Sequence, residues 1–194
     1  MIKIINMNVE DVRFPTSKDL TGSDAIHTDP DYSATYVTIT TSDNNLKGYG
    51  LAFTLGKGND IVAECIKHFF PLFNGLSIDE IEKNIGKLWY DCADHSQLRW
   101  LGPEKGVVHM ALAAIFNALW DLIAKKNQKP LWQFVVESKP ETIINWLTFK
   151  NIEDVLTKDD AFKILTKSQE FKKERIEKIL KEGYPSYTTA AGWL

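Results

Sequence analysis

The sequence predicts an α+β fold, in which a three-stranded antiparallel meander is followed by a bundle of helices. Two observations support this prediction. Alternating, β-branched segments continue to residue 55, and apolar residues then take up helical spacing from residue 59 onward. In addition, residues 105–126 are apolar almost all round, which is typical of a helix buried at the centre of a domain.

Three strands are expected near the N-terminus. Residues 2–14 alternate and are rich in β-branched side chains, and Pro15 ends this strand. Residues 34–41 and 47–55 form a β-hairpin around a short polar turn. The first strand is joined to the hairpin by a polar loop, residues 16–31, and connections of this length in compact domains are often functional.

Helices follow the strands. Residues 59–73 have apolar side chains at helical spacing, after a Gly-Lys-Gly-Asn segment that lacks the spacing of a phosphate loop and is interpreted as a strand-to-helix turn. Ser77 and Glu80 form a capping box, which opens a helix that runs toward Tyr90. The central helix at 105–126 comes next.

The last part of the chain also predicts helices. Residues 130–136 are expected to form one or two helical turns, and Ser138 with Glu141 predicts a second capping box. Thr157 begins a charged helix that is expected to end at Gly183, since glycine is favoured just past a helix end.

Residues 184–194 predict a turn followed by a β-prone segment. A strand needs a partner, because unpaired backbone groups are costly once they are buried. We therefore expect the chain to stop at the entrance to a second domain.

Composition argues against several classes of protein. The chain has 194 residues and a net charge of -3, which gives no electrostatic support for nucleic-acid binding. Asn, Asp or His interrupts the longest apolar stretches, so no membrane span is expected. Cys65 and Cys92 have no CxxC spacing, which predicts two thiols in a reducing compartment. The N-terminus does not resemble a signal peptide, and a cytoplasmic location is expected.

Polar residues on or near the helices favour structural roles. Asp91 and His95 are four residues apart and would share a helical face, but further metal ligands are missing. His109 is expected to be a hydrogen-bonded core residue. Asn117 and Asp121 are expected to satisfy buried backbone or to cap a neighbouring loop.

The long loop is the best candidate for chemistry. Gly22, Ser23 and Asp24 could present backbone donors and a carboxylate to a polyhydroxylated ligand. Tyr32 could add a phenol. The alternative is a disordered surface loop, and the sequence leaves both readings open.

Several collinear segments resemble a known family. They are Asp-Val-Arg-Phe-Pro-Thr-Ser at 11–17, Ser-Asp-Ala at 23–25, 29–34, Phe-Thr-Leu-Gly-Lys-Gly at 53–58, 97–109, Asn-Ala-Leu-Trp-Asp-Leu at 117–122, Lys-Pro-Leu-Trp at 129–132 and 183–185. Together they resemble the start of L-fuconate dehydratases, mandelate racemase-like members of the enolase superfamily. The tract at 97–132 is the most specific part of this resemblance.

The sequence departs from that pattern at three places. Gln128 stands where the family has glycine before Lys-Pro, and a left-handed backbone there would cost Gln about 1 kcal/mol relative to glycine. Residues 148–151 and Ala190 also differ from the family, which bears on the contact between the cap and the barrel.

The resemblance implies a capping domain at residues 1–137, a helical junction at 138–183, and the first barrel strand at 184–194, with the TIM-type barrel itself absent. In the family the active site lies between cap and barrel, and the barrel carries a lysine base, a histidine–aspartate dyad and three acidic magnesium ligands. The positions that match the family's substrate-contacting loop are Gly22, Ser23, Asp24 and Tyr32. This loop acts as a lid that excludes water.

The function implied is therefore that of the N-terminal portion of a magnesium-dependent sugar-acid dehydratase. The expected reaction converts L-fuconate to 2-keto-3-deoxy-L-fuconate, by removal of the α-proton and loss of the 3-hydroxyl as water. No catalytic or metal residue is expected in this chain, which is expected to be inactive alone. One alternative is a truncated, non-catalytic interaction module that self-associates through its uncovered cap face. Another is an enzyme with a different acid-sugar specificity.

Overall fold

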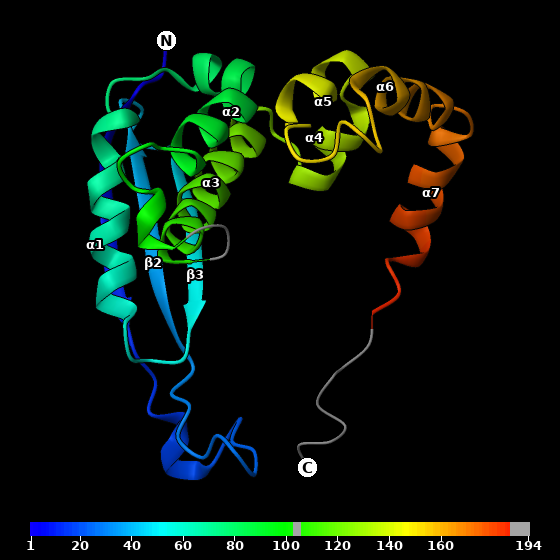
Figure 1. Ribbon diagram of the computed structural model, residues 1–194. Helices are drawn as coiled ribbons and strands as arrows, with labels where there is room; N and C mark the ends of the chain where they lie inside the picture. Colours follow the sequence, from blue (N-terminus) through cyan, green and yellow to red (C-terminus); the bar gives the residue numbers. More distant parts are fainter. Residues whose placement is uncertain (103–105, 187–194) are drawn as a thin grey trace. The chain divides into compact units, whose positions relative to one another are not determined.

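The computed structural model describes residues 1–102 and 106–186 (Figure 1). The chain divides into two compact units, Met1–Ser138 and Lys139–Leu194. The predicted strand at 184–194 falls mostly outside the described residues, and residues 184–186 form neither helix nor strand.

The first unit contains the predicted meander. Strands β1 (Ile4–Val12), β2 (Ser33–Thr41) and β3 (Lys47–Thr54) form one antiparallel sheet in the order β1-β2-β3. Their bounds lie within two residues of the expected ones. The prediction of three strands and their pairing is confirmed.

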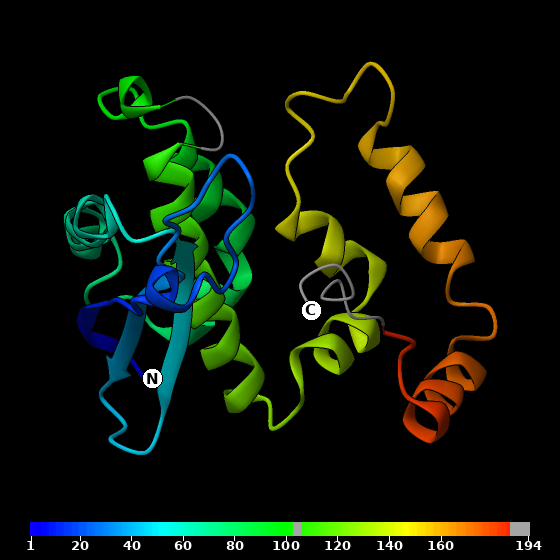
Figure 2. The ribbon, with the colours of Figure 1, turned by 90° about the horizontal axis from the view of Figure 1, so that it is seen from below.

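The helices of the first unit are η1 (Thr16–Asp19), α1 (Asn59–Phe69), η2 (Phe70–Leu72), α2 (Ile78–Ala93), η3 (Arg99–Leu101), α3 (Val107–Lys126) and α4 (Leu131–Glu137). Of these, α1 and α3 cover one face of the sheet. Helix α1 lies over β1 and β2, and α3 runs along β3, as Figures 1 and 2 show. Helix α2 packs on α3 rather than on the sheet.

Helix α3 is the centre of the core, as its apolar sequence predicts. Leu112, Ile115 and Leu119 are all less than 2% exposed. The facing strand offers Gly48 and Gly50, where a Cβ atom would collide with the α3 backbone at Ala118 and Ala114. These two glycines therefore allow helix and strand to approach closely. Within the described part of the chain, α3 is also the one helix with the length and hydropathy of a membrane span, but 61% of its apolar window is buried, as in a core helix.

The first predicted capping box is confirmed. The Ser77 N–H donates to the Glu80 carboxylate over 2.8 Å, and the Ser77 hydroxyl accepts from the Glu80 N–H over 3.2 Å. Helix α2 continues to Ala93, past the expected end near Tyr90, with a kink at Asn84.

The second unit contains α5 (Pro140–Trp146), α6 (Lys158–Lys167) and α7 (Lys172–Glu182). The predicted capping box at Ser138 and Glu141 is wrong. Lys139 is the N-cap of α5 and makes no side-chain cap bond, whereas the Ser138 hydroxyl donates to the carbonyl of Phe134 at the end of α4.

The predicted single helix from Thr157 to Gly183 is also wrong, because it is divided into two. Thr157 caps α6 as expected, its hydroxyl accepting from the Asp160 N–H over 3.2 Å. The chain then turns at Phe171, whose φ of 54° is left-handed and cannot continue a right-handed helix. Gly183, with a φ of 74°, ends α7 as expected.

Candidate functional site

The loop between β1 and β2 is closed at its base by side chains from both of its ends. The Thr16 hydroxyl donates to the Pro30 carbonyl over 3.0 Å and accepts from the Tyr32 N–H over 2.9 Å. The Asp31 carboxylate accepts from the hydroxyl of Ser17 over 2.7 Å and from its N–H over 3.1 Å. These bonds hold the pKa of Asp31 below its ordinary value. Four hydrogen bonds thus join the two ends of the loop at its base.

Two of the four predicted site residues, Gly22 and Tyr32, contact each other. Gly22 has a φ of 78°, and a Cβ atom there would collide with the Tyr32 ring. The Tyr32 hydroxyl lies 3.4 Å from the Gly22 carbonyl, and its ring packs edge-to-face on Phe53 with centroids 5.4 Å apart. The loop is thus fixed to the end of β3 by an aromatic pair.

The other two, Ser23 and Asp24, form the tip of the loop. The N–H of Ser23 donates to Leu20, and that of Asp24 donates to His27, so these two expected donors are used within the loop. The Asp24 carboxylate accepts from the His27 N–H over 2.7 Å and contacts its ring nitrogen. The backbone bond from His27 is the main cause that lowers the Asp24 pKa. What the tip offers outward is therefore an ionised carboxylate on a side chain that is 60% exposed.

The base of this loop is bonded to the turn between β3 and α1. The Asp31 N–H donates to the Leu55 carbonyl over 3.2 Å, and Gly56 lies directly against Asp31. Gly56 and Gly58 have φ values of 102° and 83°, which glycine adopts without strain. The interpretation of residues 56–59 as a strand-to-helix turn is confirmed.

Asn59, the first residue of α1, has a role that the sequence did not reveal. Its side chain is fully buried, and its oxygen accepts from the hydroxyls of Thr35 over 2.7 Å and Thr54 over 2.9 Å. Its nitrogen donates to the Ala34 carbonyl over 3.2 Å and to the Asp11 carboxylate. All four hydrogen-bonding positions of the amide are used, with partners from all three strands. A polar residue that follows two glycines at a helix start was the available signal.

Arg13 completes this network at its exposed end. Its guanidinium donates twice to the Asp11 carboxylate, over 2.8 Å and 2.9 Å, and reaches Asp60 over 3.3 Å. The bonds from Arg13 first, and from Asn59 second, hold the pKa of Asp11 below its ordinary value. An ionised Asp11 therefore stands between a cation and a buried amide.

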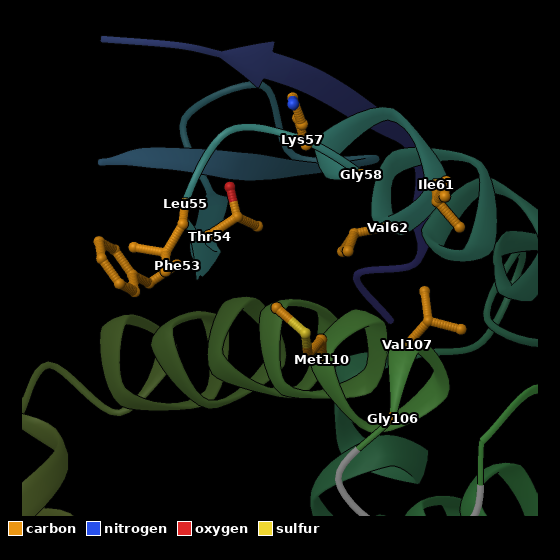
Figure 3. Close-up of a pocket in the computed structure, with 10 residues that line it drawn as sticks. All are labelled: Phe53, Thr54, Leu55, Lys57, Gly58, Ile61, Val62, Gly106, Val107 and Met110. Atoms are coloured by element: carbon orange, nitrogen blue, oxygen red, sulfur yellow. The ribbon is translucent and has the colours of Figure 1, made fainter. Parts of the chain in front are cut away.

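A pocket of about 590 Å³ lies beside the same turn (Figure 3). Phe53 and Leu55 line it from the end of β3, Ile61 from α1, and Val107 and Met110 from α3. Its lining is largely apolar, with Lys57 as a cationic residue of the turn. Phe53 also contacts Tyr32, and Leu55 also accepts from Asp31, so pocket and loop share two residues.

No group of three or more His, Cys, Asp or Glu side chains that could hold a metal is found among the described residues. His95 lies beyond the end of α2, and Asp91 pairs with Lys87 instead. Cys65 and Cys92 are unpaired, and burial raises the pKa of the Cys92 thiol to about 12.

The polar residues of α3 differ in how their surroundings compare with the predicted ones. Asp121 accepts from the N–H of Tyr49, an exposed residue of the edge strand β3, rather than from buried backbone or a loop as expected. Asn117 is exposed, so its expected role in satisfying buried backbone is wrong. His109 packs edge-to-face on Trp89, and its Nδ1 is buried with no hydrogen-bond partner in the described structure, contrary to expectation.

Comparison with known proteins gives both family and fold. Residues 18–135 match the family model of the mandelate racemase / muconate lactonizing enzyme N-terminal domain. The chain is 47% identical over 193 residues to mitochondrial enolase superfamily member 1 of Bos taurus, covering 99% of this chain and 44% of that protein. It is 43% identical to the L-galactonate dehydratase of Hypocrea jecorina, covering all of this chain and 43% of that protein.

Two solved structures agree with this comparison. The human mitochondrial enolase superfamily member 1 superposes with a TM-score of 0.92 at 45% identity, covering 97% of this chain and 43% of that one. A racemase from Streptomyces coelicolor A3(2) with bound magnesium superposes with a TM-score of 0.57 at 26% identity, covering 71% of this chain and 36% of that one.

The chain thus spans less than half the length of the relatives that it matches. Strands β2 and β3 and helices α1, α2 and α3 lie within the segment that the family model covers, and that segment is more than half of the chain. This chain therefore belongs to the enolase superfamily and carries the N-terminal capping domain of its mandelate racemase / muconate lactonizing enzyme branch.

Proposed function

We propose that this chain is the capping domain of a magnesium-dependent sugar-acid dehydratase, with L-fuconate as the substrate. The observation that carries the proposal is the ordered 16–32 loop, whose tip bears an exposed, ionised Asp24 and whose base adjoins the pocket. The similarity to an L-galactonate dehydratase along the whole chain supports the reaction class.

The chemistry of the loop suits a polyhydroxylated acid. The Asp24 carboxylate can only accept hydrogen bonds, which substrate hydroxyls can donate. The same charge repels the substrate carboxylate, so the hydroxyl-bearing end would face the loop. The Tyr32 phenol would add a contact, and so would the half-buried Ser23 beside Asp24. Gly22 keeps the space that the Tyr32 ring occupies.

The proposal assigns this chain only substrate binding and the exclusion of water. The magnesium-bound racemase that resembles it supports a magnesium requirement for the whole enzyme. The described residues do not fit such a site, because they contain no cluster of metal ligands. We therefore place the metal and the catalytic groups outside them, and we expect this chain alone to be inactive. The unpaired thiols support a cytoplasmic location.

A second candidate is a non-catalytic module that self-associates. Tyr36, Tyr49 and Leu51 are 38–54% exposed on the sheet face opposite α1 and α3. An apolar strip of this kind favours contact with another surface. Light scattering over a range of protein concentrations measures self-association. A dimer that forms with increasing concentration and that Leu51→Lys abolishes would support this candidate.

A chimera tests the enzymatic proposal. This chain replaces the matching part of the Hypocrea jecorina L-galactonate dehydratase, and a panel of sugar acids is assayed with magnesium for the 2-keto-3-deoxy product. We expect turnover, with L-fuconate favoured over L-galactonate relative to the parent enzyme. A folded chimera that is inactive on the whole panel would overturn the proposal.

A smaller exchange covers the case in which the chimera does not fold. Only residues 16–32 are moved into the parent enzyme, and the matched control moves only the β2–β3 turn, residues 42–46. The loop exchange is expected to change the ratio of kcat/KM values for the two acids, and the turn exchange is not. If the ratio of kcat/KM values is unchanged in both exchange variants, the 16–32 loop does not set the preference between the two acids.

A further inference from the structure

Asn59 lies where the three strands end, and its amide is bonded to each of them. Asp11 belongs to β1, Thr35 to β2 and Thr54 to β3. A buried amide with four satisfied bonds is held in one orientation, because any rotation leaves a polar group unpaired. The position of residue 59 is thus fixed by the sheet.

The same residue fixes the turn that precedes it. The Asn59 N–H donates to the Gly56 carbonyl over 3.2 Å. The Gly56 N–H donates to the Thr54 hydroxyl over 3.3 Å, and that hydroxyl is the one that donates to Asn59. Because Gly56 and Gly58 restrict the backbone little, the shape of the turn depends on these bonds.

The turn at residues 55–58 also holds the base of the 16–32 loop. The Leu55 carbonyl accepts from the Asp31 N–H, and the Asp31 carboxylate holds Ser17 at the other end of the loop. Leu55 and Gly58 also line the pocket. A continuous set of hydrogen bonds therefore runs from Asn59 through the turn to the loop, with the pocket rim between them.

We propose that Asn59 is a positioning residue, whose buried amide holds the turn at residues 55–58 and the base of the 16–32 loop as one rigid unit at the rim of the pocket. The role of that unit over a substrate rests on the proposed function. The coupling itself is a property of this chain and is measured without substrate or metal.

Arg13 and Asp11 belong to the same unit. Asp11 accepts from Asn59 on its buried side and from Arg13 on its exposed side, so it orients the amide. An exchange of the two groups, Asp11→Asn with Asn59→Asp, keeps a donor facing an acceptor across this contact. Asn59→Asp alone does not, because it sets two carboxylates together. Asp11→Asn alone keeps an acceptor oxygen for Asn59 and weakens the bond to Arg13.

Amide hydrogen exchange of the 194-residue chain tests the coupling. In Asn59→Asp, the amides of Asp31, Tyr32 and Gly56 are expected to exchange roughly tenfold faster relative to Leu119 in α3, because the lost bonds open this region locally. The double exchange with Asp11→Asn is expected to recover a large part of that loss. Asn127→Ala, which removes bonds at the far end of α3, is the matched control and is expected to leave the ratio unchanged.

Two results would overturn the inference. One is that Asn59→Asp speeds the exchange of all protected amides by the same factor and that adding Asp11→Asn does not reverse this. A purely structural role for Asn59 would give that result. The other is faster exchange at Gly56 with no change at Asp31 and Tyr32, which would separate turn from loop. If Asn59→Asp does not fold, Thr54→Val removes one hydroxyl of the network at nearly constant volume, and the same comparison applies. An inactive chimera would remove the proposed function and leave this coupling intact.

Discussion

The backbone N–H of Tyr49 donates to the carboxylate of Asp121 over 2.9 Å, so an edge strand of the sheet is capped by a side chain of the central helix. Lys125 extends the cap: its amine bonds Asp121 over 2.6 Å and the Lys47 carbonyl over 2.9 Å, and it lies 4.3 Å from the centre of the Tyr49 ring. Unpaired backbone groups at the edge of a sheet can template the addition of another strand. The contacts of Asp121 and Lys125 therefore make it harder for another strand to pair with β3.

Asp121→Ala is expected to lower the free energy of unfolding by about 1–2 kcal/mol, because the Tyr49 N–H loses its acceptor. Asp121→Asn keeps an oxygen at this place and is expected to lose less. Urea denaturation of the three proteins measures the difference. Equal midpoints for wild type and Asp121→Ala would show that the bond does not stabilise the edge.

Gly50→Ala is expected to destabilise the domain by about 1–3 kcal/mol or to prevent folding, because the added methyl group collides with the α3 backbone at Ala114 and Ala118. Gly75→Ala is the control. It has open space around it but a φ of 82°, so it is expected to cost only about 1 kcal/mol of backbone strain. Thermal unfolding compares the stabilities of the two variants. A smaller loss of stability in Gly50→Ala than in Gly75→Ala would contradict the close approach of α3 and β3.

Much of this fold could be predicted from sequence because its signals are local. Alternation marks the strands, the apolar run marks α3, and the Ser77–Glu80 pair marks the start of α2. The break between α6 and α7 was missed because residues 168–171 contain neither Gly nor Pro, and a left-handed Phe171 is unfavourable by local rules.

The candidate site was predictable only in part. The loop stood out by its length, and Gly22 and Tyr32 do meet in the structure. The Asn59 network was not predictable, because its partners are up to 48 positions away and come together only when three strand ends converge. Local pattern also gave no sign that the Asp24 N–H is used within the loop.

Gln128→Gly is expected to stabilise the chain by about 1 kcal/mol. Gln128 follows the end of α3 with a φ of 53°, the left-handed conformation anticipated at this departure from the family pattern. Gln133→Gly is the control, since it places glycine inside α4 and is expected to cost about 1 kcal/mol. Urea denaturation gives both values, and a loss of stability in Gln128→Gly would show that the Gln side chain makes a compensating contact.

Glu80 is expected to make the stability of the first unit depend on pH below about 4.5. The Ser77 hydroxyl, and then its N–H, bond the carboxylate and hold the Glu80 pKa below its ordinary value of 4.5. When the pKa is lower in the folded state, the carboxylate's contribution to the free energy of unfolding is complete above the unfolded-state pKa. It is lost as the pH falls through the folded-state pKa.

The free energy of unfolding of wild type should therefore exceed that of Glu80→Gln most near pH 7, and the difference should shrink in acid. Urea denaturation between pH 7 and pH 3 measures this advantage. Glu64→Gln is the control, since Glu64 is an exposed glutamate that pairs with Lys67. A constant difference between wild type and Glu80→Gln across this range would mean that the capping carboxylate is not titrating in the folded domain.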